Sequence, residues 1–321
     1  QVRQIAKKIE ESGAELVPLD DNPLDAVWRD RPQPPLAQVS EQPEPLAGKA
    51  VGEKLEELAR AIGEKRADAA VVTDPASIAW LFNIRGGDVP RTPFPLSFAL
   101  VNAAGRPELF IDGRKLSNAI RDKLETVADV REAREFSRRL KEMGRDGRKV
   151  LYDPNGSAEA VARLVEEAGG TIVEGADPVA LPKARKNPAE LLGTRLAHAR
   201  DGVAVLRFLQ WLDRSPAGTL TEIDAARRLE AFRRNTAAEG DVPLADLSFE
   251  TISSTGPNAA INHYRVTERS NRRLEAGELY LVDSGAQYRD GTTDITRTIL
   301  IGDAPRDRID LFGDRYTRVL K

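Results

Sequence analysis

Apolar residues recur at helical spacing in the segment 51–65. Val51, Leu55, Leu58 and Ile62 occupy positions i, i+4, i+7 and i+11, so they share one face of an α-helix. Further segments of the chain also have a helical character, and we expect helices over 158–168, 189–213 and 221–234. Thr221 is a suitable N-cap for the last of them.

Short apolar runs between these helices predict β-strands. In the first half of the chain they cover 69–72, 97–101, 108–111, 149–152 and 171–173. Strands that alternate with helices are typical of a layered α/β domain, which we place at residues 48–182. We expect residues 1–47 to be the end of a truncated N-terminal domain, with the end of a helix and a short strand at 15–17, followed by a proline-rich, extended linker.

The pattern changes after residue 182. Two long helices are followed by strand-like runs at 249–252, 279–283 and 292–301, which predicts an α+β domain over residues 183–321. The chain begins inside one helical pattern, at Gln1, and stops inside another, at Lys321. We therefore expect a piece of a longer polypeptide, truncated at both ends.

The amino-acid composition excludes several kinds of chemistry and of partner. The 321 residues contain no cysteine, which excludes disulfides, thiolate nucleophiles and Cys-ligated zinc. The net charge is only −3, so we expect no nucleic-acid partner. No apolar run is long enough for a transmembrane helix, so we expect no membrane partner.

Two acidic residues in the segment 279–300 form the strongest local signal. Asp-Gly at 290–291 is a hairpin turn signal. With residues 287–290 as the loop, Asp283 would lie directly opposite Asp294, with Cβ atoms about 5 Å apart. Facing carboxylates among apolar strands suit a dinuclear metal site. The alternative is that the pair caps turns or forms ion pairs with arginines nearby.

Histidine is rare in this chain. His263 lies in a loop rich in Gly, Pro and Asn, where an imidazole could donate a hydrogen bond to a developing oxyanion. A structural role is the alternative. His198, the other histidine, lies within a helix and is interpreted as structural or solvent-exposed. G-x-S-x-G, P-loop, H-E-x-x-H and G-x-G-x-x-G motifs are absent.

Several motifs together resemble one family over essentially the whole chain. They are FETISSTGPN at 249–258, His263-Tyr264, VDSGAQY at 282–288, DGTTDITRT at 290–298, AWLFNIRG at 79–86, DVP at 88–90, KARKNP at 183–188 and AHARDG at 197–202. This set resembles Xaa-Pro aminopeptidase, also called aminopeptidase P, in its three-domain long form. The 249–298 motifs carry the specific part of the resemblance.

The resemblance implies a creatinase N-terminal-like α/β domain followed by the first, incomplete half of a pita-bread catalytic domain of M24 metallopeptidase type. It implies hydrolysis of the bond between an N-terminal residue and a following proline by a hydroxide that bridges two divalent metal ions. Manganese is the expected metal, with zinc and cobalt as alternatives. Asp283 would chelate one metal, Asp294 would bridge both, and His263 would contact the substrate.

The resemblance also implies what this chain lacks. The family's His ligand and two Glu ligands would follow Lys321, so we expect the fragment alone to bind metal weakly and to be inactive. The intact protein is expected to be a cytoplasmic homodimer acting on peptides with proline at the second position. The alternatives are a creatinase-like non-peptidase hydrolase and a non-catalytic binding or scaffold relative.

Overall fold

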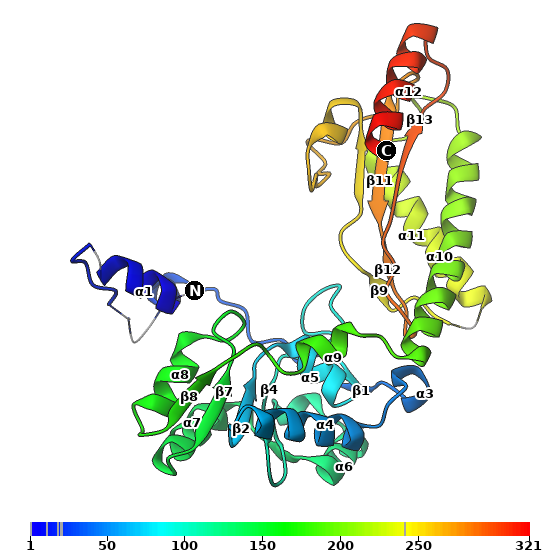
Figure 1. Ribbon diagram of the computed structural model, residues 1–321. Helices are drawn as coiled ribbons and strands as arrows, with labels where there is room; N and C mark the ends of the chain where they lie inside the picture. The colour runs from blue at the N-terminus through cyan, green and yellow to red at the C-terminus, as the bar shows by residue number, and fades with distance from the viewer. Residues whose placement is uncertain (1, 11, 18, 20–21, 241) are drawn as a thin grey trace. The chain divides into compact units, whose positions relative to one another are not determined.

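The computed structural model describes residues 2–10, 12–17, 19, 22–240 and 242–321. The chain divides into two compact units, Gln1–Asn187 and Pro188–Lys321, each with helices and strands of its own (Figure 1). Within the described residues, no helix combines the length and the apolar character needed to cross a bilayer.

A six-stranded mixed sheet forms the centre of the first unit. Its spatial order is β6-β5-β4-β2-β7-β8. The β4 strand pairs antiparallel with β2 and β5, whereas β2–β7, β5–β6 and β7–β8 are parallel pairs. The strands are β2 (Ala69–Val72), β4 (Phe98–Asn102), β5 (Glu108–Phe110), β6 (Asp129–Arg131), β7 (Lys149–Tyr152) and β8 (Thr171–Glu174).

Helices cover both faces of this sheet, which explains why its strands read as continuous apolar runs. Ala70 and Val72 pack in one core, and Ala69 and Val71 in another, because side chains alternate along a strand. The first core includes α4 (Val51–Glu64), α5 (Pro75–Leu81) and α6 (Asn118–Val127); the second includes α7 (Phe136–Arg145) and α8 (Glu159–Glu166).

The segment before α4 contains more local structure than the sequence predicts. The proline-rich stretch includes two short helices and β1 (Ser40–Glu41), which pairs with β3 (Ile84–Arg85). Proline at the first helical turn is compatible with a helix. The strand expected at 15–17 is absent, since residues 14–17 have no regular structure. The short helices of this unit are α1 (Val2–Glu10), α2 (Pro23–Val27), α3 (Glu44–Ala47) and α9 (Ala180–Ala184).

The second unit packs two long helices against an antiparallel sheet. The sheet order is β10-β11-β13, and its apolar core joins α10, α11 and β11. Figure 1 shows the long strands of this unit beside the two helices. Its elements are α10 (Pro188–Asp213), α11 (Glu222–Glu239), β9 (Asp246–Leu247), β10 (Ile252–Thr255), β11 (Leu279–Ser284), β12 (Ala286–Gln287), β13 (Ile295–Leu300) and α12 (Arg306–Leu320).

Burial alternates along β11 and fixes the orientation of Asp283. Tyr280, Val282 and Ser284 are buried, and the first two belong to the core formed with α10 and α11. Asp283 is half-buried and therefore lies on the opposite face. The expected strand at 249–252 is displaced, because pairing with β11 begins only at Ile252.

Candidate metal centre

The hairpin that carries the two aspartates has a different register from the predicted one. Asp283 pairs with Thr296 across β11 and β13. Tyr288 and Gly291 close a tight turn by backbone hydrogen bonds in both directions. The loop expected at 287–290 is therefore shorter, and Asp294 is two residues away from the position opposite Asp283. A shift of two keeps both side chains on the same face of the sheet.

Docking of the turn against α10 explains this register. A Cβ added to Gly193 would lie 2.2 Å from the carbonyl oxygen of Asp290, so the helix and the turn are in direct backbone contact. Arg200 forms two hydrogen bonds with the Asp290 carboxylate, at 3.1 and 2.9 Å. Its guanidinium also lies 4.8 Å from the centre of the Tyr288 ring. Asp290 is thus an ion-pair partner of the helix and not only a turn residue.

A buried carboxylate on α10 ties both strands of the hairpin to the helices. Asp201 is fully buried and forms a bidentate ion pair with Arg233 of α11, with N–O distances of 2.7 and 3.1 Å. It also accepts hydrogen bonds from the hydroxyls of Tyr288, at 3.1 Å, and Thr293, at 2.9 Å. The Thr293 hydroxyl in turn accepts the backbone N–H of Ala286. This network fixes Thr293, the residue immediately before Asp294.

Electrostatics link the two aspartates. Desolvation raises the pKa of Asp294, and the charge of Asp283 and a hydrogen-bonding interaction with it raise the pKa further. The hydroxyl of Thr296 donates a 2.8 Å hydrogen bond to Oδ1 of Asp283 and orients that carboxylate. A carboxylate whose ionised form is disfavoured by a second carboxylate beside it suits a cation shared with that neighbour. The residues present therefore fit a divalent metal, as two of its ligands.

The described residues do not form a complete metal site. Among them, no group of three or more His, Cys, Asp or Glu side chains is placed to hold a metal ion. Two carboxylates leave most of a divalent ion's coordination positions to other ligands. The structure thus offers part of a ligand set.

In the part of the chain that the structure describes, His263 takes no part in the hydrogen bonds of Asp283 and Asp294. Its side chain is exposed and its φ is +54°, a left-handed conformation that is uncommon for residues other than glycine. It is the third residue of a turn closed by a hydrogen bond from the Tyr264 N–H to the Ile261 carbonyl, at 3.2 Å. Among the described residues, no hydrogen bond or ion pair joins His263 to Asp283 or Asp294.

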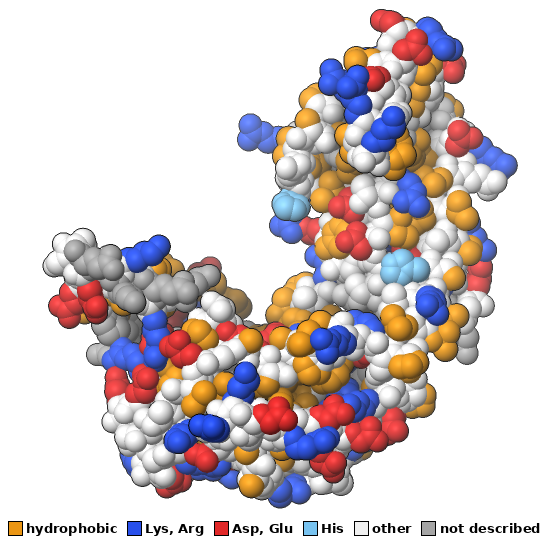
Figure 2. Space-filling view, viewed as in Figure 1, with side chains coloured by type: hydrophobic (Ala, Val, Ile, Leu, Met, Phe, Trp, Pro, Cys, Tyr) orange, Lys and Arg blue, Asp and Glu red, His pale blue; other side chains and the backbone are white. Residues whose placement is uncertain are grey.

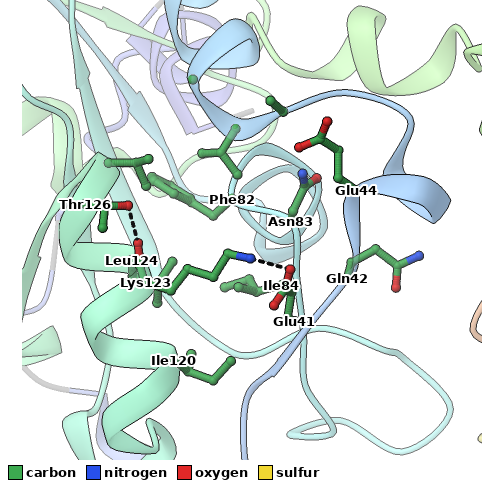
Figure 3. Close-up of a pocket in the computed structure, with 14 residues that line it drawn as sticks. Glu41, Gln42, Glu44, Phe82, Asn83, Ile84, Ile120, Lys123, Leu124 and Thr126 are labelled. Carbon is green, nitrogen blue, oxygen red and sulfur yellow. Dashed lines mark hydrogen bonds and ion pairs between the residues drawn. The ribbon is translucent and has the colours of Figure 1, made fainter.

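A separate cavity of about 220 Å³ lies in the first unit (Figure 3). Its walls are mainly apolar, and Lys123 and Glu41 form an ion pair within it. None of the predicted site residues line it. On the face shown in Figure 2, Lys and Arg are interspersed with Asp and Glu in each unit, without an extended region of one sign.

Two family models match the chain over nearly all of its length. Residues 30–190 match the creatinase/prolidase N-terminal domain, and residues 193–321 match metallopeptidase family M24. This chain belongs to the creatinase/prolidase N-terminal domain family. Its hairpin with Asp283 and Asp294 lies in the M24 portion.

The similar proteins are about twice as long as this chain. The probable Xaa-Pro aminopeptidase P of Aspergillus flavus is 36% identical over 99% of the chain and 49% of its own length. That of Metarhizium robertsii is 38% identical over 96% of the chain and 51% of its own length. The chain therefore spans about half the length of the curated relatives it matches.

Solved structures agree on the fold. A crystal structure of X-prolyl aminopeptidase from Caenorhabditis elegans, described as a cytosolic enzyme with a di-nuclear active site, matches with a TM-score of 0.84. The two sequences are 30% identical, and the match covers 95% of this chain and 50% of the nematode chain. Xaa-Pro dipeptidase from Bacillus anthracis, at 19% identity and a TM-score of 0.62, supports the fold alone. The expected α/β domain followed by a pita-bread domain is confirmed.

Three residues of the M24 unit that sequence reasoning did not select are important in the structure. Asp201 anchors the hairpin, and Glu222, at the start of α11, is fully buried and accepts hydrogen bonds from the loop that carries His263. His198 is exposed, and its charge lowers the pKa of Asp294, so it lies near the aspartate pair. Only Asp201 and His198 had a usable signal, because both lie in the AHARDG motif.

Proposed function

We propose that the full-length polypeptide containing this chain is a metal-dependent aminopeptidase that hydrolyses the bond between an N-terminal residue and a following proline. The observation that carries this proposal is the pair Asp283 and Asp294, whose side chains share one face of a hairpin in the M24 unit. Desolvation and the charge of Asp283 raise the pKa of Asp294. The names of the similar fungal and nematode proteins support the substrate class.

Asp283 and Asp294 would hold the metal. We propose two divalent ions, with manganese favoured by carboxylate oxygens such as those of the two aspartates, and zinc and cobalt as alternatives. When bound, such ions supply an activated water and stabilise negative charge on the substrate. Thr296 keeps the Asp283 carboxylate oriented by its hydrogen bond, and Asp201 holds Thr293, the residue before Asp294.

His263 is the proposed substrate contact. Its imidazole is exposed to solvent, so it is available to donate a hydrogen bond to the scissile carbonyl as charge develops there. One such donor contributes about 10²–10³-fold in rate when it acts in the transition state. The substrates would be peptides with proline at the second position.

Assembly and location are further parts of the proposal. We propose that the full-length protein is a homodimer and is located in the cytoplasm. The support for the location is that the similar Caenorhabditis elegans enzyme is described as cytosolic.

The test is a comparison of two tripeptides that differ at one residue. Full-length protein loaded with Mn²⁺ is incubated with Leu-Pro-Gly and with Leu-Ala-Gly, and release of free leucine is measured. We expect cleavage of the first and little cleavage of the second. No release of leucine from Leu-Pro-Gly by metal-loaded, folded protein would contradict the proposed activity.

Variants locate the activity in the hairpin. Asp283→Asn and Asp294→Asn should each lower kcat/KM for Leu-Pro-Gly by roughly a hundredfold or more, because each removes a metal ligand. Asp122→Asn, at an exposed position of α6 in the first unit, is the matched control and should leave kcat/KM unchanged.

A further inference from the structure

A single buried carboxylate organises the loop that carries His263. Glu222 is the first residue of α11 and is fully buried. Its oxygens accept hydrogen bonds from the Thr255 N–H at 2.7 Å, the Asn258 side-chain amide at 3.0 and 3.1 Å, the Tyr264 hydroxyl at 3.0 Å and the Arg272 N–H at 3.1 Å. Every one of these contacts is a donor to Glu222.

This set of donors suits a carboxylate that only accepts hydrogen bonds. An ionised carboxylate only accepts hydrogen bonds, at about four lone-pair positions, and charged acceptors form the stronger bonds. Within the described part of the chain, no Lys or Arg side chain forms an ion pair with Glu222. Its charge is stabilised instead by these donors and by the N-terminal end of α11.

The four donors come from successive points of one loop. Thr255 ends β10, Asn258 and Tyr264 lie in the middle, and Arg272 lies near the end. The backbone of Glu222 adds two further bonds, because its N–H donates to the Arg272 carbonyl and its carbonyl accepts the Ser253 hydroxyl. Glu222 therefore fixes both ends and the centre of the segment 255–272.

His263 depends on this arrangement through the next residue. The turn that sets the left-handed backbone of His263 is closed by the N–H of Tyr264. Tyr264 is buried, and burial together with Glu222 raises the pKa of its hydroxyl, which therefore remains a donor. A non-glycine residue keeps a left-handed conformation only where its surroundings determine it. Here the contacts of the Tyr264 hydroxyl with Glu222, Asn258 and Ser270 supply that constraint.

We propose that Glu222 is a positioning residue that holds His263 for its contact with the substrate. The role of His263 in this statement rests on the proposed peptidase function. The placement of the His263 loop by Glu222 does not depend on that function and can be measured without metal or substrate.

The first experiment measures loop placement directly. The 321-residue chain has two histidines, so ¹H–¹³C spectra of the imidazoles contain two Hε1 signals, assigned with His198→Gln. Glu222→Gln keeps the shape but turns one acceptor into a donor that faces donors. We expect the His263 signal to move towards its position in an unfolded peptide while the His198 signal stays. An unmoved His263 signal in folded Glu222→Gln protein overturns the proposal.

Two further variants serve this test, one as a control and one as a substitute for Glu222→Gln. Glu108→Gln removes another buried carboxylate, in the first unit, where Glu108 pairs with Arg131 and Arg139; it should leave the His263 signal in place. Tyr264→Phe removes the hydroxyl that links Glu222 to the turn and that also contacts Asn258 and Ser270. If Glu222→Gln does not fold, Tyr264→Phe carries the test, with the same expected shift and the same contradicting result.

The second experiment connects placement to activity in the full-length protein. A double-mutant cycle compares Glu222→Gln in the native background and in His263→Ala. We expect kcat/KM for Leu-Pro-Gly to fall about tenfold in the native background and to change by less than about twofold when His263 is absent, because the two residues act together. Equal losses in both backgrounds would overturn the proposal.

Failure of the peptidase function leaves a different pattern. In that case the native protein cleaves neither tripeptide, yet the imidazole spectra still report whether Glu222 places His263. An active protein with an unmoved His263 signal, or with equal losses in the cycle, counts against Glu222 alone.

Discussion

At the scale of single residues, the positions of Asp283 and Asp294 favour binding of a cation and not the stability of the metal-free fold. Asp283 and Asp294 share a face, and desolvation and the charge of Asp283 raise the pKa of Asp294. Without a cation, the ionised form of Asp294 is therefore disfavoured in the folded state. The hydrogen bond from Thr296 orients Asp283 without removing that repulsion.

Asp294→Asn should stabilise the metal-free chain at neutral pH. The folded-state pKa of Asp294 is raised, so its contribution to stability is favourable below the unfolded pKa and declines as the pH rises through the folded value. Because Asp294 is exposed, solvent screening keeps the gain small, within the roughly 0.5 kcal/mol typical of surface substitutions. Thermal unfolding at pH 7 and pH 3.5 measures it. A lower Tm for the variant at pH 7 would contradict this reading of the pair.

At the scale of elements, the helix α10 determines how the hairpin folds. Gly193 allows backbone contact with Asp290, and Arg200 and Asp201 bind the turn and the strand after it. The site thus depends on a helix that comes about ninety residues earlier in the chain, as the separation between Arg200 and Asp290 shows.

Two glycines of α10 give opposite predictions. A Cβ at Gly193 would meet the Asp290 carbonyl at 2.2 Å, whereas a Cβ at Gly202 would meet nothing within 4 Å. Gly193→Ala should lower the free energy of unfolding by roughly 1–3 kcal/mol through overpacking. Gly202→Ala should raise it by up to about 1 kcal/mol, because alanine favours helices. Urea unfolding of both variants measures the difference; stabilisation by Gly193→Ala would contradict the docking of the turn.

Asp74, the N-cap of helix α5 in the first unit, gives a prediction of how stability depends on pH. Burial acts to raise the pKa of Asp74, but hydrogen bonds from Lys183, Ser77 and the Ala76 N–H hold it below its ordinary 3.8. The stability that Asp74 contributes is thus fully present above about pH 4 and is lost as the pH falls through the lower folded value. Asp74→Ala should cost about 1 kcal/mol at pH 7.

The pH series supplies the control for Asp74. Urea unfolding of native chain and Asp74→Ala is repeated from pH 7 down to pH 2. The difference in unfolding free energy between them should shrink below pH 4, since the protonated carboxyl binds Lys183 less strongly. A constant difference across this range would show that the charge of Asp74 contributes nothing.

At the scale of the whole molecule, the sequence predicts the classes of domain well and the site geometry only in part. The apolar runs at 69–72 and 279–283 correspond closely to β2 and β11. Such runs predict strands because burial follows a local period. The register of the hairpin was wrong by two residues, because contacts with Gly193 and Arg200 are not visible in the local pattern.

Buried charge was the feature least accessible to sequence reasoning. Glu222 follows the N-cap Thr221 and precedes Asp224, in a capping-box pattern typical of an exposed helix start. Its burial results from a loop that folds over it from residues 255–272. Asp201 and Arg233 are likewise ordinary helix residues until α10 and α11 bring them together.

The measurement that tests the central claim most directly is a Mn²⁺ titration of metal-free, full-length protein. Bound manganese per chain and leucine release from Leu-Pro-Gly are followed together. We predict that the native protein binds two ions and becomes active as they bind, in keeping with the di-nuclear site described for the similar nematode enzyme. Asp283→Asn and Asp294→Asn should lose both responses. Retention of two bound ions and of cleavage in either variant would contradict the assignment of these aspartates as metal ligands.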